Sequence, residues 1–173
     1  MAIAISLQQY LNTHGIKYDT VSHRRTNCSR RTAKESHITE SCLAKAVVIK
    51  CKEGYVLAIV PGSREVTLRG VGAMLNEPVC LATEQELTAL FNYCKVGAVP
   101  PVGDAYGIRT IVDRSLLAEK HIYFEAGDHR TIIHLTGAEF DKLMKKVPHR
   151  NISREPRSSS SRDTTDSTAY WGA

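Results

Sequence analysis

The sequence predicts an α+β fold, with a mixed, barrel-like β-sheet surrounded by short helices. Three observations favour this class. Runs rich in β-branched residues, which indicate strands, outnumber the segments with helical features. Threonine–glutamate pairs with the spacing of a helix capping box occur at three points along the chain. The helices that they predict are scattered among the strands instead of alternating with them, which is typical of α+β proteins.

The N-terminal part predicts a helix, a short strand and a second helix. The first helix is expected to end at Gly15, because glycine readily adopts the left-handed conformation that follows a helix. Residues 17–22 alternate enough to form a short strand. Thr32 and Glu35 fit a capping box, in which a hydroxyl and a carboxylate satisfy N–H groups at a helix start. A helix is therefore expected over residues 33–40.

The middle and the end of the chain predict a hairpin, three helices and three strands. Residues 44–50 and 55–60 are β-branched runs joined by Glu53 and Gly54, a typical hairpin turn. Helices are expected over residues 68–75, from Thr83 to about Phe91 and from Thr136 to about Lys146, the last two opened by capping boxes. Further strands are expected at residues 109–113, 122–125 and 131–135.

The composition changes near the C-terminus. Nine of the 23 residues from Asn151 onward are Ser or Thr, and almost no apolar residue precedes Tyr170 and Trp171. Such a segment cannot bury enough surface to offset the entropy of ordering it. We expect one domain over residues 1–148 and a Ser/Thr-rich, disordered tail over residues 149–173.

Length and composition indicate a cytoplasmic protein. A chain of 173 residues favours one domain with a tail over two full domains. No apolar run approaches the roughly 20 residues of a membrane span, and the N-terminus lacks the basic start of a secretory signal. The five cysteines are scattered, without C-x-x-C spacing, which favours ordinary buried thiols. Cys94 is the one candidate for reactivity, because it lies beside the loop described below.

Basic residues are concentrated near the N-terminus. The formal net charge is +5, and residues 17–52 contain nine Lys or Arg against three Asp or Glu. A clustered basic surface suits a polyanion, because each neutralised phosphate releases counterions. A solvated basic surface without a partner would give the same pattern. Charge alone therefore leaves both interpretations open.

The sequence lacks the common catalytic and metal-binding motifs. It contains no G-x-S-x-G, H-E-x-x-H, P-loop or G-x-G-x-x-G pattern. Its seven histidines are dispersed, and the spacing of His129 and His134 does not place both on one face of a strand. We expect neither a metal ion nor a cofactor.

Two features could carry chemistry. The first is a loop of small residues and two prolines: Gly97, Ala98, Val99, Pro100, Pro101, Val102 and Gly103. A stiff loop with small side chains lets backbone N–H and C=O groups approach a ligand, although a purely structural connection would look the same. The second is Lys45, which stands between two alanines at the start of an apolar strand. Its ammonium could meet a phosphate or a developing oxyanion, or simply reach into water from the strand end.

The order of these features resembles the YbaK/ProX family of aminoacyl-tRNA deacylases. The matching motifs are A-K-A-V-V-I around Lys45, V-P-G after the next strand, the G-x-x-x-P-x-G loop, I-V-D at residues 111–113 and E-A-G-D at residues 125–128. The resemblance spans residues 1–147. It implies a compact α+β domain around a barrel-like sheet. It also implies trans-editing, which is hydrolysis of the ester that links a mischarged amino acid to the terminal adenosine of tRNA.

The resemblance also implies roles for individual residues. Lys45 matches the family lysine and is expected to be catalytic. Gly97, Pro101 and Gly103 match the family loop, so Gly97 to Pro101 and Gly103 are expected to bind the substrate. His134 falls where some members carry a histidine that lines the pocket. Departures from the family pattern at Ala46 and Val102 leave the amino acid open, although the family suggests a small one.

The expected partner is the aminoacylated acceptor end of tRNA, and an aminoacyl-tRNA synthetase is a second partner. The residues expected to bind the acceptor stem are Arg24, Arg25, Arg30, Arg31 and Lys34. An activated ester needs no catalytic triad, because positioning the carbonyl and stabilising negative charge suffice. Two alternatives remain: an inactive tRNA- or nucleotide-binding module of the same fold, and a hydrolase of another small ester or amide. Lys45 together with a complete loop favours the editing enzyme.

Overall fold

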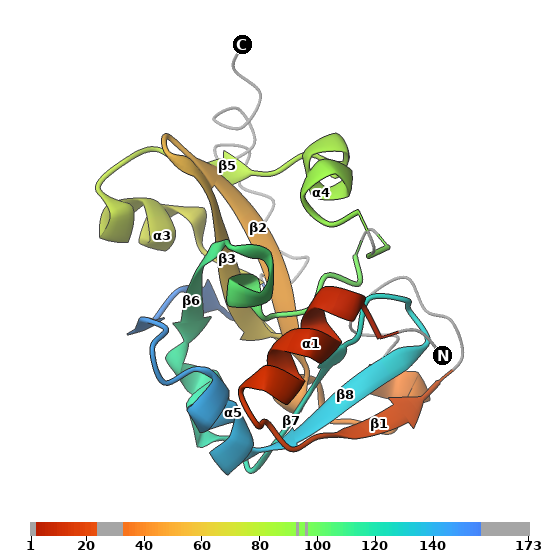
Figure 1. Cartoon of the computed structure of the whole chain (residues 1–173). Helices are drawn as coiled ribbons and strands as arrows, with labels where there is room; N and C mark the ends of the chain where they lie inside the picture. The colour runs from red at the N-terminus through yellow and green to blue at the C-terminus, as the bar shows by residue number, and fades with distance from the viewer. Residues whose placement is uncertain (1–2, 24–32, 93, 96, 157–173) are drawn as a thin grey trace.

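The structure, a computed structural model, describes residues 3–23, 33–92, 94–95 and 97–156 (Figure 1). Its helices are α1 (Ile5–Thr13), α3 (Leu68–Leu75), α4 (Glu84–Leu90) and α5 (Gly137–Leu143). Its strands are β1 (Asp19–Ser22), β2 (Ala44–Cys51), β3 (Gly54–Pro61), β4 (Glu65–Val66), β5 (Cys80–Leu81), β6 (Arg109–Asp113), β7 (His121–Glu125), β8 (Thr131–Thr136), β9 (His149–Arg150) and β10 (Ser153–Arg154). This mixture of strands and scattered short helices confirms the α+β class. None of these helices has the length and apolar character that a membrane crossing requires.

The strands form separate sheets, and the expectation of a barrel was wrong. The largest sheet has the order β5-β2-β3-β6-β9, with antiparallel and parallel pairs. A three-stranded antiparallel sheet has the order β1-β8-β7, and β10 pairs with β4. The outer strands β5 and β9 each have only two residues. Within the described residues these short edges do not meet, so the ladder is not closed.

The three-stranded sheet buries one face under α1 and α5, as Figure 1 shows for α1. Leu7 and Leu11 of α1 and Phe140 of α5 pack in one cluster with Phe124 and Ile133. All five side chains are fully buried. We call this face the inner face and the opposite one the outer face.

The five-stranded sheet is covered on both faces. Ile49 on β2 belongs to a cluster that includes Val71 of α3, whereas the neighbouring Val48 belongs to a cluster with Phe91, which follows α4. Successive strand residues point to opposite faces, so α3 and α4 lie on opposite sides of the sheet. This explains the long apolar runs of β2 and β3, since a strand covered on both faces needs no polar alternation.

Local sequence rules predicted several elements correctly. The hairpin of β2 and β3 closes where Cys51 pairs with Gly54, which has a left-handed φ of 114°. Thr83 and Glu86 form the complete capping box at the start of α4. At α5 the Thr136 hydroxyl accepts a hydrogen bond from the Glu139 N–H. The Glu139 carboxylate instead accepts a hydrogen bond from the N–H of Lys17.

The structure differs from the expectations at two segments. Residues 33–35 are helical, but the chain then turns, so the helix expected over 33–40 is shorter. Residues 149–154, expected in the tail, form β9 and β10 and bury Ile152. Asp113 holds this segment, because its Oδ2 accepts a hydrogen bond of 2.9 Å from the Ile152 N–H. Burial alone would raise the pKa of Asp113, but hydrogen bonds from Ser115 and Ile152 hold it below its usual value.

Replacing Glu86 with glutamine should reduce stability in a pH-dependent way. Hydrogen bonds from Lys50, the Thr83 backbone and Tyr55 lower the pKa of Glu86 to about 2 from 4.5. Below pH 4.5 the unfolded chain therefore takes up this proton before the folded chain does, and the stabilisation by Glu86 is lost as the pH falls toward 2. Glutamine keeps the capping box without the charge. Urea unfolding should show Glu86→Gln less stable at pH 7, by a difference that shrinks steadily as the pH falls from about 4.5 toward 2; a constant difference would contradict this.

Candidate functional site

Lys45 lies at the start of β2, where the two larger sheets meet. It pairs with Val60 of β3, and its side chain is partly buried. One residue before β2, Leu43 forms a parallel bridge with Tyr123 of β7. Two residues further along both strands, Lys45 comes level with Glu125 and on the same side, because side chains alternate with a period of two. Lys45 therefore belongs to the outer face of the three-stranded sheet.

Glu125 and His23 form a buried acid–base pair at this end of the outer face. Their Oε2 and Nε2 atoms are 3.7 Å apart, and the side chains are 11% and 1% exposed. Buried ionisable groups are retained in proteins when opposite charges and hydrogen bonds compensate them. Counting along the strands from the bridge thus places Lys45 on the same side of the sheet as a shielded carboxylate.

The turn after β7 brings His129 against the proline loop. Asp128 shapes this turn, because its Oδ1 accepts hydrogen bonds from the N–H groups of Arg130 and Thr131. His129 is buried in the left-handed conformation, with φ of 60°. A Cβ built on Gly97 would lie 3.4 Å from the His129 Cε1. The expected loop therefore begins at the same end of the sheet as Glu125, one turn away from it.

The interior of the loop packs into the protein, with Ala98, Pro100, Pro101 and Gly103 buried. Val99 joins the cluster of Val48 and Leu57, while Val102 joins the cluster under the three-stranded sheet. The loop is therefore structural along most of its length and connects two cores. Among the described residues, the N–H of Val99 has no hydrogen-bond partner, and Gly97 is exposed. Gly97 is therefore the exposed part of the loop, and the N–H of the buried Val99 is a donor that no described group uses.

Replacing Gly97 with alanine should impair turnover more than stability. Its φ of +84° is unfavourable for alanine, at about 1 kcal/mol, and the new methyl group would press on His129. We expect a clear loss in the rate of ester hydrolysis together with only a small loss in the free energy of unfolding. Gly54→Ala is the matched control, since Gly54 also has a positive φ (+114°) but no described atom lies within 4 Å. Equal effects of the two variants on turnover would argue against a role for this end of the loop.

Two of the other expected site residues, His134 and Lys34, lie in the described part of the chain. His134 is on β8, on the outer face, where its ring stacks on Tyr123 with centroids 4.6 Å apart. Lys34 is exposed within the helical residues 33–35. Arg24, Arg25, Arg30 and Arg31 lie outside the described residues. Whether these residues contact tRNA stays a prediction.

Cys94 has the environment of an unreactive thiol. Burial raises its pKa, although the Tyr106 hydroxyl 3.5 Å away acts in the opposite sense. A raised pKa keeps the group as a thiol, and the thiolate is the reactive form. Cys94 instead packs where a Cβ on Gly127 would approach its Sγ to 3.4 Å.

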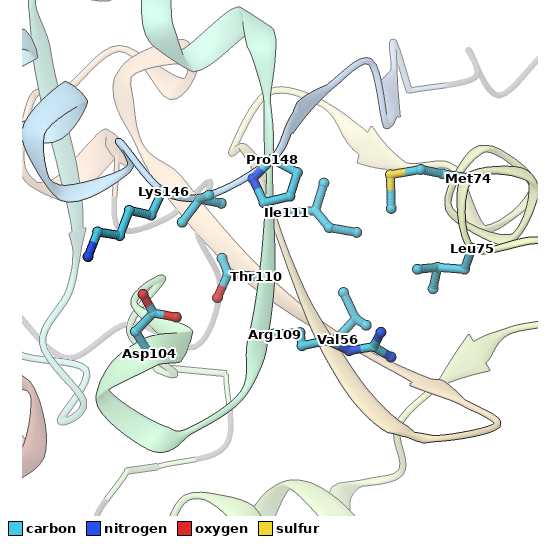
Figure 2. Close-up of a pocket in the computed structure, with 10 residues that line it drawn as sticks. Val56, Met74, Leu75, Asp104, Arg109, Thr110, Ile111, Lys146 and Pro148 are labelled. Carbon is cyan, nitrogen blue, oxygen red and sulfur yellow. The ribbon is translucent and has the colours of Figure 1, made fainter.

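A cavity of about 300 Å³ opens beside the five-stranded sheet, between α3, β6 and the segment that follows α5 (Figure 2). Apolar side chains of α3 and β6 line it, with Met74, Leu75 and Ile111 labelled in Figure 2. Arg109 and Lys146 are its cations. Its lining includes none of the expected site residues. In the part of the chain that the structure describes, no three His, Cys, Asp or Glu side chains are grouped to hold a metal ion.

Sequence reasoning missed Glu125, His23 and His129 as site residues. Glu125 carried two usable indications, because it begins the E-A-G-D motif and ends an apolar strand in a position that alternation assigns to the outer face. His23 lies just before the basic segment and appeared to be part of it. His129 approaches Gly97 only through the turn that Asp128 stabilises, which no short-range pattern predicts.

Comparison with known proteins agrees with the α+β fold. The model of a family described as the aminoacyl-tRNA editing domain matches residues 23–143. A hypothetical protein of known structure is similar, with a TM-score of 0.77 and 22% identity over 86% of this chain and 99% of its own. A candidate trans-editing enzyme for prolyl-tRNA synthetase has a TM-score of 0.76 and 21% identity over 88% of this chain and 99% of its own. At these identities the two structures establish the fold alone. No curated protein sequence matches the chain.

Proposed function

The chain belongs to the aminoacyl-tRNA editing domain family, and we propose that it hydrolyses mischarged aminoacyl-tRNA with Lys45 and the start of the 97–103 loop at its centre. It is a trans-editing deacylase: the bond that breaks is the ester between the amino acid and the terminal ribose. The amino acid removed is a small one. Its partner is the acceptor end of tRNA.

The reaction requires a water molecule, a positioned carbonyl and stabilised negative charge. Water attacks the ester carbonyl carbon, and the carbonyl oxygen becomes an oxyanion. The Lys45 ammonium and the N–H of Val99 are the groups proposed to stabilise it or to hold the terminal phosphate. The ester C–O bond then breaks, and the proton from water passes to the ribose oxygen that leaves. The neighbouring ribose hydroxyl assists this transfer, so no protein nucleophile is needed.

One observation carries the proposal of the site. Lys45 is level with the buried Glu125, and the turn that follows Glu125 presses His129 against Gly97. A cation, a shielded acid–base pair and an exposed loop glycine therefore share one end of the molecule. Each of these groups occurs by itself in many proteins without a function, whereas all of them together at one end are typical of a functional site.

The deciding experiment is hydrolysis of a panel of labelled tRNAs that carry wrong amino acids. A mischarged proline tRNA is the first substrate to include, because a structural relative is described as a candidate trans-editing enzyme for prolyl-tRNA synthetase. We expect one or a few species with a small amino acid to be deacylated, and the correctly charged tRNAs to survive. Binding of tRNA with no hydrolysis of any species would favour the inactive binding module.

A free ester added to the same panel tests the other alternative, a hydrolase of small esters or amides. A free aminoacyl ester without tRNA should be a poor substrate, because most of the binding energy comes from the nucleic acid. Equal hydrolysis of the free ester and the tRNA would favour a hydrolase of small esters. Affinity for tRNA should also fall as salt rises if the N-terminal basic residues contact phosphates.

A further inference from the structure

The outer face of the three-stranded sheet carries a cluster of aromatic rings that the proposed reaction does not use. His134 of β8 stacks on Tyr123 of β7, with centroids 4.6 Å apart and 18° between the planes. The ring of His121 of β7 is tilted by 31° against the His134 ring, with centroids 5.2 Å apart. His134 is therefore the common partner of the other two rings. We call these three residues the ring cluster.

The ring cluster is open to solvent. His121 is exposed, Tyr123 is half-buried, and the His134 side chain is 18% exposed. The inner face of the same strands is fully packed, with Ile122 and Leu135 at most 1% exposed. Aromatic side chains grouped on the open face of a sheet cost solvation without adding to the core. They are instead typical of surfaces on which unpaired nucleobases stack.

Polar contacts join the two imidazoles to each other and to the start of β1. The His134 Nε2 and the His121 Nδ1 lie 3.0 Å apart and share a hydrogen bond. On its other side the His134 Nδ1 lies 3.4 Å from the Oδ2 of the exposed Asp19. The ring cluster therefore presents polar ring nitrogens as well as flat faces, and nucleobases can interact with both.

The cluster lies on the same face as the proposed catalytic site. Tyr123 is two residues before Glu125 on β7, and alternation places both on the outer face. On the edge of β7 that faces away from β8, Tyr123 forms a bridge with Leu43, which is two residues before Lys45. One step of two residues along a strand is about 7 Å, the order of the spacing between successive nucleotides. A nucleic acid end that reaches Lys45 can therefore lay its preceding bases on the rings.

We propose that the ring cluster of His121, Tyr123 and His134 binds unpaired nucleobases of the tRNA 3′ end by stacking. This inference rests on the proposed function, because it assigns the surface that receives the single-stranded end of that substrate. In sequence the basic residues Arg24 and Arg25 follow the end of β1 after one intervening residue, which suits the same ligand.

The test compares binding of two uncharged tRNAs, one intact and one trimmed of its unpaired 3′ nucleotides. We expect trimming to weaken binding to the wild-type protein by about tenfold, the effect of one stacked base. Tyr123→Leu should bind the intact tRNA about as weakly as the trimmed one, whereas Tyr123→Phe should behave as the wild type. Tyr55→Leu, which changes a half-buried tyrosine of the five-stranded sheet, is the matched control and should leave both affinities unchanged.

The inference is overturned if Tyr123→Leu still distinguishes the two tRNAs as strongly as the wild type. Should that variant not fold, the exposed His121→Ala is measured in its place, with the same expectation of a reduced difference. Because uncharged tRNA is used, the result is independent of hydrolysis. If the wild-type protein deacylates tRNA but binds the intact and trimmed tRNAs equally well, the ring cluster has no part in binding. If it distinguishes the two tRNAs but deacylates neither, only the proposed activity is wrong.

Discussion

Lys45→Ala is expected to lower the turnover of mischarged tRNA by about 100-fold or more, the usual effect of removing one group that stabilises an oxyanion. Lys45 lies two residues after the bridge that joins the start of β2 to β7, on the same side as the buried Glu125. Removal of its charge would leave the developing oxyanion with neutral donors alone. The measurement is the rate of deacylation under single-turnover conditions, which separates the chemical step from tRNA binding and release.

Lys50→Ala is the matched control for this experiment. Lys50 is on the same strand, but its side chain is 52% exposed and pairs with Glu86 at 2.6 Å. A surface ion pair contributes little to stability and nothing to the proposed chemistry. We expect Lys50→Ala to retain nearly full turnover. Similar losses in both variants, or near-normal turnover of Lys45→Ala, would contradict a catalytic role for Lys45.

Gly103→Ala is expected to destabilise the protein by about 3 kcal/mol or more, at the upper end of what overpacking costs. A Cβ at this position would collide with the Thr110 Oγ1 and lie 2.5 Å from the Ile108 carbonyl oxygen. Thr110 is buried in β6, and Ile108 donates its N–H to the Gly103 carbonyl. Backbone must therefore move to admit a methyl group. Urea unfolding measures the loss.

Gly107→Ala separates this steric effect from the loss of glycine flexibility. Gly107 has a left-handed φ of +67°, yet no described atom lies within 4 Å of its added Cβ. We expect a loss of only about 1 to 2 kcal/mol there, the cost of the left-handed conformation for alanine. If Gly103→Ala were no worse than Gly107→Ala, the close packing at Gly103 would not limit stability. Gly103 would then be free for the ligand role that the family resemblance implies.

Elements governed by neighbouring residues were predictable. The hairpin of β2 and β3 follows from two β-branched runs and a Gly54 turn, and the capping box of Thr83 and Glu86 needs only a spacing of three. Where a long-range partner competes, the local rule fails in part. At α5 the Glu139 carboxylate bonds the Lys17 N–H, so its capping box is left half-formed.

The candidate site divides in the same way. Lys45 and the loop could be named from the sequence because unusual residue types stand in a short, ordered pattern. The position of Glu125 beside Lys45 depends on a parallel bridge between segments about 80 residues apart in sequence. The burial of most of the loop could not be anticipated either, because two separate cores have to assemble around Val99 and Val102.

By itself the sequence determined the α+β class, the main hairpin, most helix starts and the lysine–loop pair that resembles an editing family. These depend on backbone preferences and on neighbours a few residues away. Only the tertiary structure decided that the sheets stay open, that residues 149–154 pair with the domain, that His23 pairs with Glu125, and that His129 lies against Gly97. Those outcomes depend on register and packing summed over distant segments, and no local pattern in the chain encodes them.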